Sequence, residues 1–176
     1  VMLDIGTDWV DLFPQGNATA KGNERAFREF QGPEDKVKSL YCDNALALTK
    51  AAEKCGYVNP TSTPYRSESN AIAERWVRTV HEGTRTNLEE SGIPLKIWPR
   101  AGKHFWFAHN MTDTGGTCPY FKRHGRWCKA KAIPFGATID FRPSKPMCKK
   151  LPKAGPNGIL GIMLGYRLQP GGRWSG

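Results

Sequence analysis

The stretch NAIAERWVRTVHEGTRTNLEESG, residues 70–92, decides most of the expected fold. Apolar side chains recur in it at multiples of four residues: Ile72, Trp76, Val80 and Leu88. This period predicts the buried side of one long helix over residues 70–91, and Gly92 followed by Pro94 ends that helix.

A polar row occupies another face of the same predicted helix. Its members are spaced by four, three and four residues: Glu74, Arg78, His81 and Arg85. A carboxylate followed by cationic or neutral donors suits a site where a metal ion meets a phosphodiester. A solvated helix face with an ordinary Glu–Arg pair fits these residues equally well.

The elements around this helix predict an α/β core over residues 1–112. Strands at 1–5 and 9–13 form a hairpin, a helix follows at 19–31, and a strand at 37–42 precedes a helix at 49–55. A further helix at 97–110 leads to a linker over 113–132. Residues 133–176, with expected strands at 133–141 and 159–166, predict a small all-β unit.

The strand predicted at 37–42 delivers Asp43 and Asn44 to its carboxyl end, where open α/β sheets bind ligands. Thirty residues separate Asp43 from Glu74. Taken singly, each acid is ordinary, because a strand-end Asp is common and the helix dipole favours Glu in a first turn.

Charge is divided unevenly along the chain, which has a net charge of +10. Residues 1–115 carry a net charge of −1, and residues 116–176 carry +11. This asymmetry predicts a polyanionic partner, nucleic acid before an anionic membrane, although a solvated basic face without a partner is the alternative. The candidate contacts in the basic part are Lys122, Arg123, Arg126, Lys129 and Lys131.

Composition limits the remaining classes. No run of eighteen apolar residues exists, so no spanning helix is expected. The chain opens in what reads as mid-strand without a signal peptide, and we expect it to be a piece of a longer protein. Five cysteines without a C-x-x-C pattern indicate reduced thiols in a cytosolic or nuclear protein, with zinc at Cys118, His124 and Cys128 a minor alternative.

Several of these stretches together resemble the integrase core of copia-type LTR retrotransposons, in the retroviral integrase superfamily. They are LDIGTDWVDLFP (3–14), CDNA (42–45), TSTP (61–64), SNAIAER (69–75) and EGTR (82–85). A later part, from IPFG (133–136) to GILGIMLGY (158–166), resembles the SH3-like unit that follows the core in these polyproteins.

The resemblance implies an RNase H-like fold, a mixed five-stranded sheet flanked by helices, followed by the SH3-like β-unit. It implies that Asp43 and Glu74 are the second and third acids of a triad that binds Mg²⁺ (or Mn²⁺) and trims and joins DNA ends. The residues expected at the DNA from this part are Asn44, Asn70, Arg75, Arg78, His81 and Arg85. The implied partners are element ends and target DNA, bound by a homo-oligomer in the nucleus or cytoplasm, with no membrane.

The sequence also departs from the family. In the family, the first acid of the triad belongs to a strand before the one that opens this chain, and Asp4 matches a different aspartate. The sequence leaves open whether Asp4 substitutes for the missing first acid. Leu46-Ala47-Leu48 replaces an acidic–aromatic pair, and Ser67-Glu68-Ser69 stands where the family has Pro-Gln-Ser. Three functions therefore stay open: an integrase fragment, a non-catalytic nucleic-acid-binding module, or an inactive relic.

Overall fold

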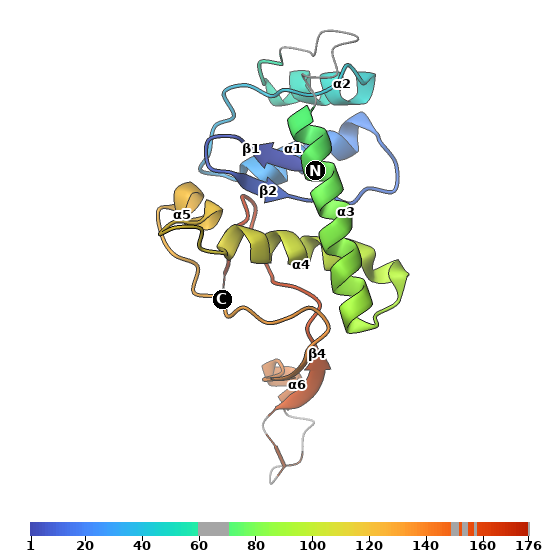
Figure 1. Ribbon diagram of the computed structural model, residues 1–176, viewed down its shortest axis with the longest axis vertical. Coiled ribbons are helices and arrows are strands. Elements are labelled where there is room, and N and C mark those ends of the chain that lie inside the picture. The colour runs from blue at the N-terminus through green and yellow to red at the C-terminus, as the bar shows by residue number, and fades with distance from the viewer. Residues whose placement is uncertain (60–70, 149–151, 153–154, 157, 176) are drawn as a thin grey trace.

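The chain has a mixed α/β structure of helices and two separate two-stranded antiparallel sheets (Figure 1). The computed structural model describes residues 1–59, 71–148, 152, 155–156 and 158–175. The predicted contact Asn70, the loop before it and the TSTP motif lie outside the described residues.

The predicted N-terminal hairpin is confirmed. Strand β1 (Met2–Asp4) pairs with β2 (Trp9–Asp11) in the register Met2↔Asp11 and Asp4↔Trp9. Successive side chains of a strand point to opposite faces, yet Trp9 and Val10 are only 1% and 0% exposed. The hairpin is therefore covered on both faces.

Asn110 takes the place of a neighbouring strand beside β2. Its side-chain carbonyl accepts the Val10 N–H at 3.2 Å, and its amide donates to the Val10 carbonyl at 2.7 Å. Because both backbone groups of a buried strand residue need partners, this amide satisfies them without a third strand.

Two helices pack on each other beyond the hairpin. Thr19 caps α1 (Ala20–Gln31) by accepting the Gly22 N–H, and Gly56, in the left-handed region, ends α2 (Leu46–Cys55). Phe27 of α1 packs against Ala51 and Ala52 of α2. Both helices were predicted, although the predicted start of α2 was residue 49 and the helix begins at Leu46.

The strand predicted at 37–42 was wrong. Within it, Ser39 makes a single parallel bridge to Val58 and no ladder follows. A strand needs a partner over several residues, and the described chain offers none here beyond Val58. The five-stranded sheet implied by the resemblance is likewise not found in the described residues, whose sheets have two strands each.

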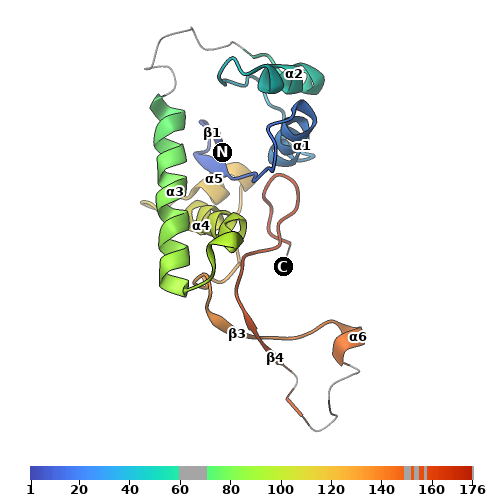
Figure 2. The same cartoon turned by 90° about the vertical axis from the view of Figure 1, so that its right-hand side faces the viewer.

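The long predicted helix is α3 (Ala71–Ser91), which crosses α4 (Trp98–Met111) after the short 3-10 turn η2 (Leu95–Ile97). Val80 and Leu88 are buried as expected, whereas Ile72 is 58% exposed and Trp76 half-buried. The reason is tertiary, because α3 begins beyond the hairpin and away from α4, as Figure 2 shows.

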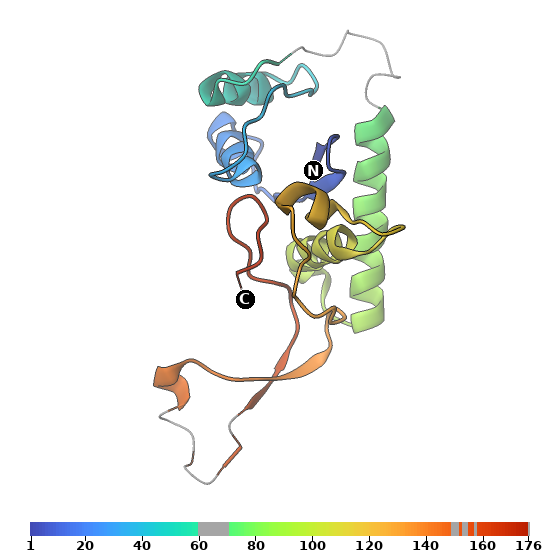
Figure 3. The same ribbon diagram turned by 90° about the vertical axis from the view of Figure 1, so that its left-hand side faces the viewer.

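The basic part of the chain is attached to this core. Helix α5 (Pro119–His124) lies beside the hairpin, while β3 (Thr138–Phe141) and β4 (Ile159–Ile162) form a ribbon that leads away from the body with α6 (Lys145–Cys148) (Figures 1 and 3). The chain then returns, and Tyr166, Leu168 and Trp174 pack around Trp9. The two expected strands are present in shortened form, and the domain boundaries stay predictions.

Candidate nucleic-acid interface

The two predicted catalytic acids are both on the surface. Asp43 lies just before α2, where one of its carboxylate oxygens accepts the Ala45 N–H at 3.2 Å, and the neighbouring Asn44 is exposed. Glu74 lies in the first turn of α3. Helix α2 and the start of α3 stand at the same end of the molecule (Figure 2). That one metal ion joins these acids stays a prediction.

The part of the chain that the structure describes contains no group of three or more His, Cys, Asp or Glu side chains able to hold a metal ion. Cys118, His124 and Cys128, the minor zinc alternative, therefore do not form such a group. The Cys118 sulfur instead accepts the Phe121 N–H at 3.4 Å and caps α5, while the His124 ring packs between Trp9 and Tyr120.

Asp4 is held by its own turn. Its carboxylate accepts hydrogen bonds from the Gly6 N–H at 3.0 Å and the Thr7 hydroxyl at 2.6 Å, and Arg123 Nη1 lies 3.7 Å away. These contacts close the hairpin between β1 and β2. Asp4 therefore has a structural task in the hairpin turn.

The basic residues predicted on α3 share exposure to solvent: Arg75, Arg78, His81 and Arg85. The helix turns Val80, Gly83, Thr84 and Leu88 inward instead, and its packing partner is α4. Within residues 1–59, 71–148 and the described part beyond, no carboxylate forms an ion pair with these three arginines. Their charges are thus available to an external anion.

The basic residues predicted after residue 116 differ from one another. Arg126, Lys129 and Lys131 are exposed. Lys122 is also at the surface, but its ammonium pairs with Asp8 at 2.6 Å. Four of the five therefore remain where a partner could reach them.

Arg123 points into the protein, and its side chain is only 4% exposed. Its guanidinium lies 2.9 Å from Asp35, donates to the Phe30 carbonyl at 2.6 Å and covers the Phe30 and Trp9 rings. Burial lowers the pKa of this group, and Asp35 and Asp4 oppose the shift. Because its charge is already neutralised inside, we leave Arg123 out of the interface.

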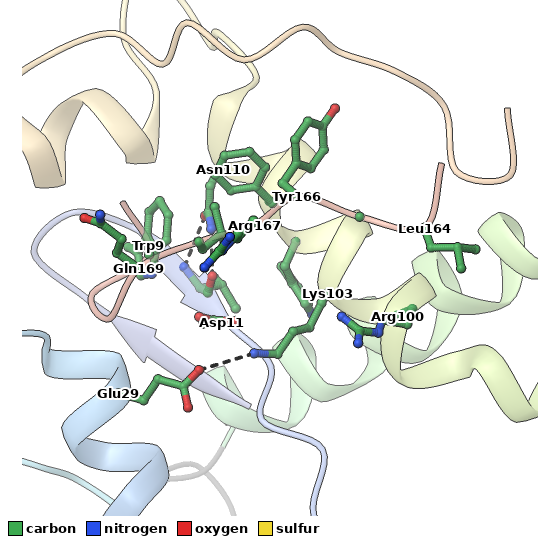
Figure 4. Close-up of a pocket in the computed structure, with 16 residues that line it drawn as sticks. Trp9, Asp11, Glu29, Arg100, Lys103, Asn110, Leu164, Tyr166, Arg167 and Gln169 are labelled. Carbon is green, nitrogen blue, oxygen red and sulfur yellow. Dashed lines mark hydrogen bonds and ion pairs between the residues drawn. The ribbon is translucent and has the colours of Figure 1, made fainter. Parts of the chain in front are cut away.

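Sequence reasoning missed a cavity of about 230 Å³ between β2, α1, α4 and the returning segment, with apolar walls and several charged residues (Figure 4). Asp11 lies at its wall, and Glu29 pairs with Lys103 across it at 3.7 Å. Burial raises the pKa of Asp11 to about 6, while Lys103 acts against this shift. The available signal was an acid inside the apolar run Trp9-Val10-Asp11-Leu12-Phe13.

Three further findings bear on function. No described helix is long and apolar enough to cross a membrane. Models of known protein families, when compared with the sequence, give no match. A comparison with curated proteins also gives none.

Proposed function

We propose that this chain binds DNA along α3, as part of an integrase core of the copia retrotransposon type. The observation that carries the proposal is the row Arg78, His81 and Arg85, exposed on one face of a helix whose other face packs on α4. Unpaired arginines on one helix face can contact the phosphates of a DNA backbone, and phosphate contacts supply most of the affinity of such interfaces.

The proposal includes the finer architecture expected from the resemblance, an RNase H-like core followed by an SH3-like unit. Its partners would be element ends and target DNA, its active form a homo-oligomer, and its location the nucleus or cytoplasm within a retroelement polyprotein. The motifs CDNA (42–45) and SNAIAER (69–75), in this order and separation, support it.

The acids fit Mg²⁺ or Mn²⁺ in chemistry, since both are exposed carboxylates and hard cations prefer oxygen ligands. They do not fit in number, because the described residues contain no group of three or more possible ligands. A bound divalent ion would promote in-line attack on a phosphodiester. We assign Asp43 and Glu74 to ion binding and derive no catalytic step.

A second candidate is a nucleic-acid-binding module without catalysis. The observation that favours it is Asp4, whose carboxylate is occupied by the hairpin turn. Under this alternative DNA binding requires Arg78 and Arg85 but neither acid.

The interface is tested by Arg78→Gln/Arg85→Gln against a charge-matched control, Arg25→Gln/Lys50→Gln, whose residues are exposed on α1 and α2. We expect the first pair to weaken duplex binding and to reduce the slope of log K against log salt by about 2, because roughly 0.9 counterions are released per phosphate contact. The control should keep the wild-type slope. Equal losses in both doubles would show that total charge, and not α3, binds DNA.

The role of Glu74 is tested separately by Glu74→Gln, with duplex affinity measured in EDTA and in Mg²⁺. In EDTA the variant should bind more tightly than wild type, because a carboxylate repels phosphate. Mg²⁺ should strengthen wild-type binding and leave the variant unchanged. If Mg²⁺ affects both proteins alike, the non-catalytic alternative is preferred.

A further inference from the structure

We infer that α5 and the segment after it carry a stacking site for an unpaired base of single-stranded DNA, formed by Phe121 and Trp127. This inference extends the proposed function and shares with it the class of ligand, but it uses residues that are not on α3. Helix α5 and the following segment run along the outer side of the body (Figures 1 and 3).

The two rings form an outward-facing pair. Their centroids lie 5.0 Å apart at an interplanar angle of 32°, and Phe121 and Trp127 are 36% and 47% exposed. An exposed indole beside an exposed phenyl ring leaves apolar area in contact with water, which is unfavourable for both rings. The outer face of Trp127 is a surface on which a base can stack.

The chain on both sides of Phe121 is anchored to the body. Tyr120 is buried in the Trp9 cluster, and Arg123 is fixed by Asp35 and the Phe30 carbonyl. The Gly125 N–H bonds back to the Phe121 carbonyl at 2.8 Å, and φ of Gly125 is 65°, which ends α5 and turns the chain toward Trp127. A platform fixed in this way loses little conformational freedom when a ligand binds.

The charge around the rings identifies the occupant. Residues 117–139 contain no Asp or Glu, and exposed cations stand on both sides of Trp127: Lys122, Arg126, Lys129 and Lys131. Aromatic faces interleaved with cations match a chain of bases joined by phosphates, the arrangement by which single strands are bound without regard to sequence. Lys122 already pairs with Asp8, so the charges that a purely apolar protein partner would leave unpaired are those of Arg126, Lys129 and Lys131.

The other exposed aromatic residues of the described chain have no second ring paired to them: Tyr41, Trp98 and Phe141. Tyr166 and Trp174 are only partly exposed and pack against the Trp9 cluster, and the Tyr166 hydroxyl donates a hydrogen bond to the Lys131 carbonyl at 2.7 Å. Trp98 is exposed at the start of α4, without a second ring paired to it among the described residues. Trp98 is therefore a suitable control for a surface tryptophan.

The test uses the whole chain with an oligothymidine of about 12 nucleotides, within the site sizes of single-strand binders, and a duplex of equal length. Trp127→Leu keeps an apolar side chain but removes the aromatic face, whereas Trp127→Phe keeps stacking. We expect Trp127→Leu to weaken oligothymidine binding at least about fivefold, Trp127→Phe less than twofold, and Trp98→Leu not at all. Phe121→Ala should resemble Trp127→Leu.

Fluorescence provides a second measurement that does not depend on variants that weaken binding. In a Trp98→Phe background, oligothymidine should quench the emission of Trp127, the remaining strongly exposed tryptophan of the described chain. Wild-type affinity of Trp127→Leu, no quenching, or equal loss for oligothymidine and duplex would each overturn the inference. Duplex binding that fails in Arg78→Gln/Arg85→Gln while oligothymidine still quenches Trp127 separates this site from the α3 interface.

Discussion

At the scale of single residues, two buried titratable groups change the stability of the fold in opposite directions as pH rises. Burial raises the pKa of Asp11 to about 6 in the wall of the cavity, where Lys103, Glu29 and Arg123 are its charged neighbours. Burial, with Arg123, Arg173 and Arg126, lowers the pKa of His124 to about 4. Burial favours the neutral form of each group, so the two shifts have opposite effects on stability as pH changes.

The sign follows from proton binding. Folded Asp11 binds its proton more tightly than the unfolded chain, so its contribution is present below about pH 4 and is lost as pH rises to about 6. Folded His124 binds its proton less tightly, so its contribution is present above about pH 6.5 and is lost as pH falls to about 4. Each amounts to at most about 3 kcal/mol.

We therefore predict that Asp11→Asn gains stability relative to wild type as pH rises from about 4 to about 6, while His124→Phe loses stability relative to wild type over the same range. His104 and His109, whose pKa values burial also lowers, contribute equally to all three proteins. Urea unfolding at a series of pH values measures both differences. Curves parallel to wild type in both variants would contradict the prediction.

At the scale of elements, the crossing of α3 and α4 depends on a missing side chain. A Cβ on Gly83 would lie 2.3 Å from the Phe105 ring, so the ring occupies the space that any larger residue of α3 would need. Gly102 of α4 leaves a similar space for Leu12, at 2.4 Å. The basic face of α3 is exposed because this close packing fixes the helix rotation.

Gly83→Ala should lower the free energy of unfolding by about 1–3 kcal/mol through overpacking, although alanine favours a helix by up to about 1 kcal/mol. Gly22→Ala is the matched control, because the Cβ there meets the movable end of the Gln15 side chain at 2.6 Å. Urea unfolding should find Gly22→Ala neutral or stabilising. In a Phe105→Leu background the cost of Gly83→Ala should fall, and an unchanged cost would exclude the ring as its cause.

At the scale of the whole molecule, residues near the end of the described chain complete the hydrophobic cluster around Trp9. Trp9 lies in a cluster with Phe107 and Tyr120, which Tyr166, Leu168 and Trp174 cover from the other end of the chain. The Gly171 N–H donates to the Glu29 carbonyl at 2.7 Å, and Arg173 pairs with Glu34. The basic returning segment is thus a part of the body that carries α3.

Gly172→Ala should destabilise the entire chain. A Cβ there would lie 2.1 Å from the Trp9 ring, and φ is +80°, so overpacking and backbone strain add to about 2–4 kcal/mol. Gly165→Ala, at φ +142° with no atom within 4 Å, measures strain without the clash. The thermal transitions followed by far-UV circular dichroism and by tryptophan fluorescence should coincide, and both should occur at a lower temperature in Gly172→Ala than in wild type. A transition of the C-terminal part alone would show that it folds separately.

Local pattern by itself determined the hairpin, the long helix and its polar row, because caps, turn residues and periodicity act within a few residues of each other. It also marked Asp43 and Glu74 as acids worth testing. Tertiary structure alone decided that Ile72 is exposed, that Ser39 has one bridge instead of a sheet, and that Arg123 is buried while Trp127 is not. Burial and pairing depend on which distant segments arrive beside a residue, and a single sequence contains no direct record of those neighbours.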